Sequence, residues 1–520
     1  MIALLLFALG GVVPLVAAPP RPRLVVVITV DQLRPDYFER YRTQLRGGFA
    51  VLLKGGAVFT NAYQDHAVTE TAPGHATILS GRVPAHTGII SNLHGVQDST
   101  APVLGFSGVG ASPARLRGTE LFDWLKAAEP AARALSVSGK DRGAILPLGH
   151  AKQQVYWYRA GVFTTSHYYA DSLPTWVQAF NAQRVPFRAA ATEWTLLLPE
   201  RAYPEPDSVP YENQGRDVTF PHRLPGDSQR AAVAFIATPT MDSLTLAFAL
   251  EGTRALRLGA HGATDLLLVS LSTTDYVGHA FGPDSREIHD QVVRLDRYLG
   301  RFLEQLAVRY GRDNVLVVLT ADHGVTPFPE RSRALGHSGA VRVIPDSVIR
   351  SANAVLDQRV GGGTGDWLVM ETGMVLLASR AVLAAHGVDV DSVIAALATR
   401  LAALPGVARV DRPADLAGQD TSDPVVRRWR HQLPPDAGVE LVVTLKPYSV
   451  WGSPSVAIAM HGQPTDLDAH VPLVFFGPGI RHAVHAGRVR SIDIAPTLAR
   501  LLDLTPAESL DGRVLTELWP

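Results

Sequence analysis

Three apolar runs, each followed closely by an aspartate, constrain the fold of this 520-residue chain more than any other feature. Residues 24–30, 265–271 and 315–319 consist mostly of Val, Leu and Ile. Runs that do not alternate with polar residues are typical of strands buried on both faces of a parallel sheet. Because helices must cover both faces of such a sheet, the sequence predicts a three-layer α/β protein with a central, mostly parallel sheet flanked by helices.

The carboxylates after these runs should lie at one edge of the sheet. Asp31 follows the first run directly, and Asp275 and Asp322 follow the other two within a few residues. In open α/β sheets ligands bind at the carboxyl ends of the strands, so these distant residues can converge. His279, one helical turn after Asp275, and His323 bring imidazoles to the same edge. One such aspartate usually caps a helix, but three of them, two with a histidine nearby, indicate a shared site.

The stretch Val-Thr-Glu-Thr-Ala-Pro-Gly-His-Ala-Thr-Ile-Leu-Ser-Gly, residues 68–81, predicts a helix with a hydroxyl at its start. Pro73 suits the first helical turn, where its missing N–H would be unpaired anyway, and Gly81 ends the helix. Thr71 then lies among unpaired helix amides at the positive end of the helix dipole, which favours phosphate or another oxyanion. Taken alone, Thr71 fits a helix cap better than a nucleophile, because caps are far commoner.

The candidate ligands form a mixed carboxylate and imidazole set. A further histidine, followed by glycine, precedes another apolar run at residues 471–477. The six candidates are Asp31, Asp275, His279, Asp322, His323 and His461. Such a set suits zinc better than magnesium or calcium, and six ligands together with Thr71 imply two ions. Two metal ions can clamp an in-line displacement at phosphorus, and zinc makes a threonine hydroxyl reactive at neutral pH, so Thr71 becomes the natural nucleophile.

These motifs resemble the alkaline phosphatase superfamily. The resemblance rests on Asp31, on Thr71 in Thr-Ala-Pro-Gly-His, on Asp275 with His279, on Ala-Asp-His-Gly at 321–324 and on His461 with Gly462. Ser-Gly-Lys-Asp-Arg-Gly-Ala-Ile-Leu-Pro-Leu-Gly-His at 138–150 further resembles the phosphate-insensitive PafA-type alkaline phosphatases, which are related to type I phosphodiesterases and nucleotide pyrophosphatases. The resemblance spans nearly the whole chain after residue 18 and implies an alkaline phosphatase-like fold with inserted cap regions.

The resemblance also implies how the ligands divide. One zinc ion would be bound by Asp275, His279 and His461, and the other by Asp31, Thr71, Asp322 and His323. The non-bridging oxygens of the phosphate would be held by Asn92, Lys140 and Arg142. A monoester dianion carries more charge than a diester, and two cations in a partly dry cleft favour that extra charge. Without a metal site beside it, a Lys-x-Arg pair would be interpreted as a solvated surface pair. The segment 238–243, Thr-Pro-Thr-Met-Asp-Ser, departs from the family pattern, which has Gly-Asn after the Pro-X pair.

The sequence thus predicts a zinc-dependent alkaline phosphatase that hydrolyses phosphate monoesters through a covalent phosphothreonine on Thr71. A phosphodiesterase or nucleotide pyrophosphatase of the same superfamily is the first alternative, because it would share the metals and the threonine. A metal- or phosphate-binding protein without turnover is the second, although it would not need Thr71. A sulfatase is disfavoured, because the chain has no cysteine and Thr71 is not in a Cys/Ser-x-Pro-x-Arg sequence.

Composition and the N-terminal segment limit the partners. The chain carries 48 basic and 49 acidic residues, so no overall field attracts nucleic acid or an anionic membrane. Residues 1–18 are apolar, end in Val-Ala-Ala and precede two prolines, which predicts a cleaved secretory signal, with an uncleaved membrane anchor as the alternative. We therefore expect a periplasmic or secreted monomer that acts on small-molecule phosphate monoesters, with no nucleic acid-binding domain and no membrane span after cleavage.

The predicted catalytic core is discontinuous in sequence. It comprises residues 22–100, 228–344 and 455–520, because core elements come from both ends of the chain. Residues 101–227, rich in aromatic residues and proline, are predicted as an insertion over the sheet edge that bears Lys140 and Arg142. Residues 345–454 are predicted as a second inserted subdomain. An amphipathic helix after residues 284–285 and a short helix at 494–502 should pack on the sheet.

Overall fold

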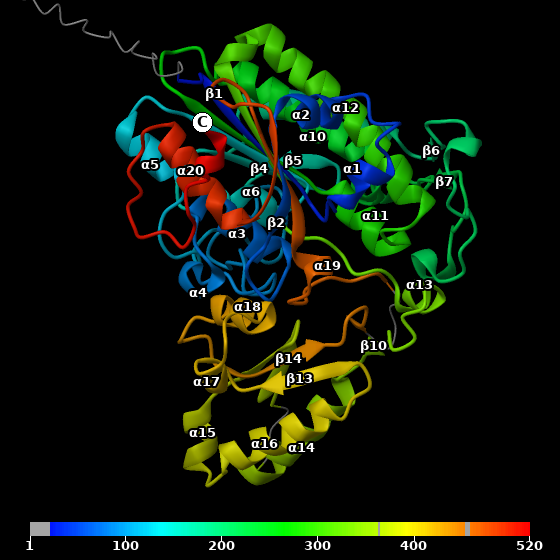
Figure 1. The fold of residues 1–520 in the computed structure, drawn as a ribbon, viewed down its shortest axis with the longest axis vertical. Helices are drawn as coiled ribbons and strands as arrows, with labels where there is room; N and C mark the ends of the chain where they lie inside the picture. The colour runs from blue at the N-terminus through cyan, green and yellow to red at the C-terminus, as the bar shows by residue number, and fades with distance from the viewer. Residues whose placement is uncertain (1–20, 362–364, 453–457, 520) are drawn as a thin grey trace, which may run out of the picture.

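A nine-stranded sheet forms the centre of the molecule (Figure 1). The computed structural model describes residues 21–361, 365–452 and 458–519, and the predicted signal sequence, residues 1–18, lies outside them. In spatial order the strands are β17 (Ala483–Arg490), β2 (Ala57–Tyr63), β16 (His470–Phe476), β9 (Val315–Thr320), β1 (Leu24–Val30), β8 (Asp265–Leu271), β3 (Ala134–Ser138), β4 (Gln154–Arg159) and β5 (Val162–Thr164).

The three apolar runs form β1, β8 and β9, as predicted, and lie side by side. β1 is central and pairs in parallel with both neighbours, so that Leu24 is opposite Asp265 on one side and Val315 on the other. Every residue of the three strands is buried, which explains the absence of polar alternation. Their carboxyl ends therefore share one edge of the sheet. The run at 471–477 forms β16, which is antiparallel to β9 and β2, so the sheet is mixed.

Helices cover both faces of this sheet, which confirms the predicted three-layer α/β architecture (Figure 1). One face packs against α2 (Gly48–Gly55), α10 (Pro239–Ala255) and α12 (Arg286–Tyr310), and the other against α3 (Thr71–Ser80), α5 (Leu121–Ala128), α6 (Asp141–Ile145) and α20 (Ile494–Leu501). The helix predicted after residues 284–285 is α12, and the Ser285 side chain caps it by accepting a hydrogen bond from Ile288 N–H.

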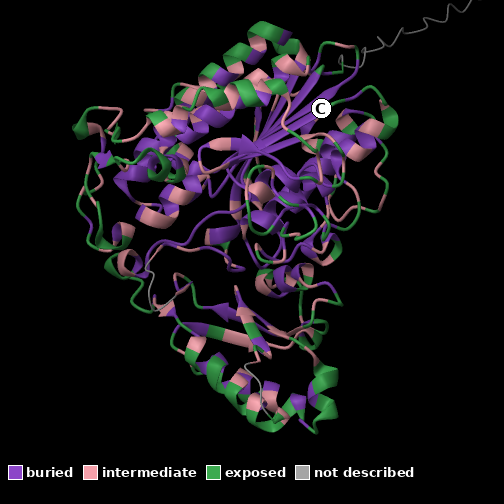
Figure 2. Cartoon of the chain, turned by 180° about the vertical axis from the view of Figure 1, so that it is seen from behind, coloured by how far each residue is buried: buried purple, intermediate pink, exposed green. Residues whose placement is uncertain are grey.

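A second body, at the bottom of Figure 1, has a hydrophobic core of its own. Its antiparallel sheet has the order β11 (Leu368–Glu371), β12 (Met374–Leu377), β14 (Val439–Leu445) and β13 (Val407–Asp411). Helices α14 (Asp346–Val360), α15 (Arg380–Ala385) and α16 (Val390–Ala402) pack on it, with their outer faces exposed in Figure 2. This body falls within the stretch predicted as the second inserted subdomain.

Residues 101–227 contribute strands to the central sheet as well as covering it. β3, β4 and β5 come from this stretch and are the last three strands on one side of the sheet. β3 is fully buried and pairs in parallel with β8. Only the later part of the stretch lies over other elements. There the two short antiparallel strands β6 (Glu193–Trp194) and β7 (His222–Arg223) face α11 (Thr273–Phe281) (Figure 1).

Within the described residues, no helix taken singly has the length and apolarity needed to cross a membrane. The segments Ser228–Ala237 and Pro239–Ala255 meet those criteria only as a pair, and they are bent by 87° relative to each other.

Candidate active site

The predicted carboxylates converge at the carboxyl edge of the central strands. Asp31 follows β1, Asp322 follows β9, and Asp275 lies in the first turn of α11, which follows β8. Ligand atoms of Asp31, Asp322 and His323 lie within 4.8 Å of one another, and so do those of Asp275, His323 and His461. His323 thus lies between two clusters, whereas the family resemblance assigns it to one of them.

Three imidazoles present their Nε2 atoms to this centre. His461 Nε2 lies 3.2 Å from His279 Nε2, and each lies within 3.5 Å of Asp275 Oδ1. The Nδ1 atoms of His461, His279 and His323 point to the backbone carbonyls of Thr69, Ala459 and Gly324, at 2.7, 2.6 and 2.9 Å. A carbonyl can only accept, so Nδ1 carries the proton and Nε2 keeps a free lone pair. This is the tautomer that a metal ligand requires.

The donor atoms that face the centre fit a cation. In the described part of the chain, Asp31 Oδ1, Asp322 Oδ2 and His323 Nε2 are buried acceptors, and of the three only Asp322 Oδ2 has a donor nearby, His75 Nδ1 at 3.2 Å. Buried polar atoms without partners are costly, and three acceptors that converge would repel one another. A bound cation satisfies all three, and the mixed oxygen and nitrogen set suits zinc.

The ammonium of Lys140 compensates part of this negative charge. Its Nζ lies 2.6 Å from Asp31 Oδ2 and 2.5 Å from Asp275 Oδ2. Burial alone would raise the pKa of Asp275, but Lys140 and His279 lower it well below its usual range. Asp31 has the opposite shift: burial, with the charges of Asp275 and Asp322, raises its pKa well above the usual range. Burial lowers the pKa of His461 to about 4, which keeps that imidazole neutral.

Thr71 is the first residue of α3 and is 1% exposed. The N-cap position belongs to Glu70, and no side chain caps the helix there. The hydroxyl of Thr71 instead lies 3.5 Å from Lys140 Nζ. The interpretation of Thr71 as a simple cap therefore does not hold, and its hydroxyl faces the charged centre.

Of the three predicted phosphate-binding residues, Asn92 and Lys140 contact the start of α3, and Arg142 is on α6, which packs against α3. Asn92 Oδ1 accepts a hydrogen bond from Ala72 N–H at 2.9 Å, next to Thr71. Lys140 occupies the position before α6 and Arg142 its first turn. Arg142 Nε is buried and has no partner among the described residues, and its nearest ion pair, with Asp141, is 3.6 Å long. A partly buried guanidinium that is so weakly paired can still bind an anion.

Two further residues support the site, and neither was among the predicted site residues. Gln32 donates from Nε2 to Asp275 Oδ1 at 2.8 Å, and its backbone N–H donates to Asp322 Oδ1. His75, for which the sequence predicts a structural or supporting role beside the metal ligands, contacts Thr71 O, Ser270 Oγ and Asp322 Oδ2 at 2.8 to 3.2 Å. The only signal for Gln32 was its place directly after Asp31.

Close approaches of neighbouring atoms explain the glycines of two motifs. A Cβ on Gly74 would lie 2.3 Å from the carbonyl oxygen of Asp322, and a Cβ on Gly278 would lie 1.8 Å from Oε1 of Gln32. A larger residue at position 74 would push α3 away from Asp322, and one at position 278 would displace the Gln32 side chain and its hydrogen bond to Asp275. The spacing of Thr-Ala-Pro-Gly-His and of Asp-x-x-Gly-His thus follows from packing around the site.

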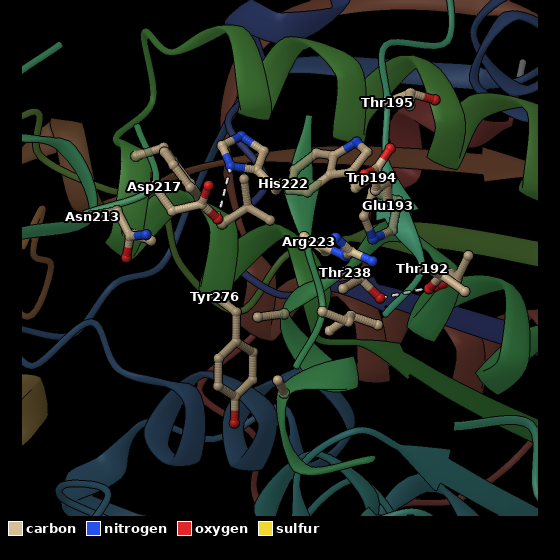
Figure 3. Close-up of a pocket in the computed structure, with 18 of the residues that line it drawn as sticks. Thr192, Glu193, Trp194, Thr195, Asn213, Asp217, His222, Arg223, Thr238 and Tyr276 are labelled. Carbon is tan, nitrogen blue, oxygen red and sulfur yellow. Dashed lines mark hydrogen bonds and ion pairs between the residues drawn. The ribbon is translucent and has the colours of Figure 1, made fainter. Parts of the chain in front are cut away.

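A cavity of about 330 Å³ flanks α11 (Figure 3). It is lined by β6 and β7, by the start of α10 and by one side of α11, including Trp194, Thr238, Tyr276 and Phe281. None of the predicted metal ligands lines it. Tyr276 forms part of its wall, and the centre of that ring lies 5.3 Å from Lys140 Nζ. The segment 238–243, which departs from the family pattern, therefore forms part of a cavity beside the site, and its Asp242 accepts a hydrogen bond from Thr273 N–H at the start of α11.

Comparison with known proteins agrees with this geometry. A family model described as type I phosphodiesterase / nucleotide pyrophosphatase matches residues 25–366. Alkaline phosphatase PhoK of Sphingomonas sp is 34% identical over 96% of this chain and 92% of its own. Alkaline phosphatase PafA of Elizabethkingia meningoseptica is 32% identical over 96% of this chain and 95% of its own.

Solved structures give the same result. The crystal structure of wild-type alkaline phosphatase PafA matches with a TM-score of 0.87 and 31% identity, covering 96% of this chain and 99% of that one. Murine ectonucleotide pyrophosphatase / phosphodiesterase 5, at 17% identity and a TM-score of 0.53, shares the fold. The fold is thus alkaline phosphatase-like, and the protein is a phosphoester hydrolase. The chain belongs to the type I phosphodiesterase / nucleotide pyrophosphatase family, and its alkaline phosphatase relatives support a phosphatase.

Proposed function

We propose that this protein is a zinc-dependent alkaline phosphatase that hydrolyses phosphate monoesters through a phosphothreonine on Thr71. The observation that carries the proposal is the place of the Thr71 hydroxyl, which lies at the start of α3 and 3.5 Å from an ammonium that bridges the carboxylates of two ligand clusters. One zinc ion is assigned to Asp275, His279 and His461, and the other to Asp31, Thr71, Asp322 and His323. His323 faces both clusters.

The residues of this chain divide the reaction between them. Two bound zinc ions would supply Lewis-acid stabilisation of the attacking and leaving oxygens. Thr71 Oγ1 attacks phosphorus, the bond from phosphorus to the ester oxygen breaks, and the alcohol leaves with a proton. Water then attacks the phosphothreonine, which releases inorganic phosphate and restores the hydroxyl. Glu70 and the first turn of α3 keep Thr71 in place throughout.

Asn92, Lys140 and Arg142 are proposed to hold the non-bridging oxygens. The charge of a monoester is spread over three oxygens in the transition state. In a diester one of these oxygens carries a second organic group and no charge, so a diester gains less from two cations. Lys140 and Arg142 therefore favour monoesters. The proposed substrates are small-molecule phosphate monoesters, and the proposed enzyme is a periplasmic or secreted monomer that uses residues 1–18 as its export signal.

Replacing both cations tests the proposal. Each charge-assisted hydrogen bond in such a site is worth about 2–4 kcal/mol, roughly 30- to 1,000-fold in rate. Lys140→Ala combined with Arg142→Ala should lower kcat/KM for an aryl phosphate monoester at least roughly 30-fold and change diester hydrolysis much less. Because Lys140 also pairs with Asp31 and Asp275, the metal content of each variant must be measured, and Arg142→Ala alone serves as the variant that spares these carboxylates.

The family description supports one alternative, a phosphodiesterase. The same experiment separates the two functions, because a phosphodiesterase should lose little selectivity when the cations are removed. Equal losses on both substrates, or faster turnover of diesters than of matched monoesters by the unmutated enzyme, would favour the phosphodiesterase.

A further inference from the structure

The turn between β11 and β12 is a point where the second body contacts the candidate active site. This turn, Glu371-Thr372-Gly373, is named here the hairpin tip. Glu371 pairs with Met374 across the hairpin, so Thr372 and Gly373 form a two-residue loop, and both have positive φ, 42° and 84°. That conformation is typical of tight hairpin turns. Val443 N–H donates to the carbonyl of Gly373 at 2.7 Å, which ties the tip to its own sheet.

Glu371 holds the loop that carries Asn92. Its Oε1 accepts a hydrogen bond from Leu93 N–H at 3.3 Å, and its Oε2 lies 2.9 Å from His94 Nδ1. The carboxylate is 8% exposed at the residue level, so water competes little for it. Two successive residues after Asn92 are therefore fixed by one side chain of the second body.

Thr372 reaches Asn92 from the other side through Glu70. The Thr372 hydroxyl donates to Glu70 Oε1 at 2.5 Å, and Glu70 Oε2 accepts from Asn92 N–H at 2.7 Å. Glu70 is the residue before Thr71. One carboxylate thus joins the hairpin tip, the proposed phosphate-binding asparagine and the residue next to the proposed nucleophile.

The hairpin tip also packs against a third segment of the site. A Cβ on Gly462, the residue after His461, would lie 2.4 Å from Thr372 Cγ2. The tip therefore fits closely between the segments that carry Thr71, Asn92 and His461.

We propose that Glu371 and Thr372 are positioning residues, through which the second body fixes Asn92 and so sets how tightly a phosphate oxygen is held. This inference rests on the proposed function, because it takes Asn92 as a phosphate ligand. It gives the second body a role in phosphate binding that does not require any of its residues to touch the substrate.

A double-mutant cycle tests the inference. Thr372→Val keeps the shape of the side chain and removes the hydroxyl, so it should lower monoester kcat/KM by about tenfold, the value of one buried hydrogen bond to a charged group. Thr372→Ser should restore most of the activity. In an Asn92→Ala background Thr372→Val should have little further effect, whereas in an Arg142→Ala background the two losses should multiply.

A matched control comes from another contact between the two bodies. Arg117 forms an exposed ion pair with Asp436 at 2.6 Å, away from Asn92. Asp436→Asn should leave kcat/KM unchanged. Two results would contradict a positioning role: a decrease in kcat/KM for Asp436→Asn as large as that for Thr372→Val, or the same decrease for Thr372→Val with and without Asn92. Either would show that the hairpin tip only stabilises the structure.

Binding of inorganic phosphate, measured by calorimetry on the same variants, separates this inference from the proposed reaction. Phosphate should bind about tenfold more weakly to Thr372→Val than to the unmutated protein. In the Asn92→Ala background, adding Thr372→Val should not weaken phosphate binding further. If monoesters were not hydrolysed but this coupling appeared, the proposed function would fall and the positioning role would stand. Equal phosphate affinity in Thr372→Val and the unmutated protein would overturn the inference.

Discussion

Lys140 serves two sets of neighbours at once. Its ammonium bridges Asp31 and Asp275 and also lies near the Thr71 hydroxyl. Burial alone would lower the pKa of Lys140, but the charges of Asp275 and Asp31 raise it above its ordinary value, so the side chain stays charged. Removing this one charge would leave two buried carboxylates with less compensation, in addition to the loss of the proposed phosphate contact.

The hydroxyl of Thr71 gives the sharpest prediction at this scale. Thr71→Ala should fold and retain most of its metal, because the six other proposed ligands remain. Its turnover should fall by several orders of magnitude, because nucleophilic catalysis is lost. Thr71→Ser, which keeps a hydroxyl, should stay far more active. Hydrolysis by Thr71→Ala near the unmutated rate would rule out the covalent mechanism.

The sequence could predict the residues whose types reveal their chemistry. Asp31, Asp275 and Asp322 follow apolar strands, and the sheet brings them together as expected. The role of Gln32 could not be predicted, because it depends on a left-handed backbone conformation, with φ of 66°. In this conformation the side-chain amide of Gln32 donates to Asp275 and its backbone N–H donates to Asp322. Glu371 lies more than 250 residues from the loop that it holds, and no local pattern connects the two.

At the scale of elements, α11 is held on several sides. Asp275 and His279 face the candidate metal centre, Tyr276 and Phe281 line the flanking cavity, and the buried carboxylate of Asp242 accepts from Thr273 N–H at its start. The short helix η2 (Glu212–Gly215) packs against the same helix. The order of α11 therefore depends on residues from the stretch 101–227 as well as on the core.

Glu212, on η2, should make the stability of the folded protein depend on pH. Its side chain is buried, and burial, together with the charge of Glu287, raises its pKa from 4.5 to about 9. Between these values the folded protein keeps a proton that the unfolded chain releases, so the stability contributed by protonated Glu212 is full below pH 4.5 and is lost as the pH rises toward 9. Glu212→Gln should thus become more stable than the unmutated protein as the pH rises, by about 1–3 kcal/mol between pH 5 and 8.

Thermal unfolding at several pH values would check this expectation. The exposed Glu304 on α12 supplies the control, since Glu304→Gln should show the same difference from the unmutated protein at pH 5 and pH 8. A Glu212→Gln variant whose relative stability did not change with pH would show that Glu212 is ionised in the folded protein.

At the scale of the whole molecule, the central sheet was predictable and the insertions were less so. Buried strands such as β1 and β9 can be predicted from their apolar composition. β3, with the sequence Ala-Leu-Ser-Val-Ser, is just as buried but carries two serines, so its place beside β8 does not follow from its composition. The boundaries 101–227 and 345–454 remain predictions, because a chain passes between layers without a local signal at each crossing.

Removal of the metal ions should lower the stability of the whole folded protein. Three buried carboxylates and three imidazoles meet at the sheet edge, and a ligand that binds only the folded state stabilises it by about 4 kcal/mol at a thousand times its Kd. Chelation should therefore lower Tm and abolish activity, and zinc should restore both better than magnesium. Elemental analysis should find two zinc equivalents, one fewer in His279→Ala and no change in His150→Ala. Full activity and unchanged Tm without metal would contradict a metal centre.

The position of β16 has a consequence for how this protein comes into being. β16 lies between β2 and β9, although about 400 residues of chain separate it from β2. A nascent chain that has emerged just past β9 already has Asp31, Thr71 and Asp322, but it lacks both His461 and the strand that joins β2 to the rest of the sheet. Contacts between such distant segments form late and slowly. Synthesis must therefore be almost finished before the molecule can bring all of its candidate metal ligands together.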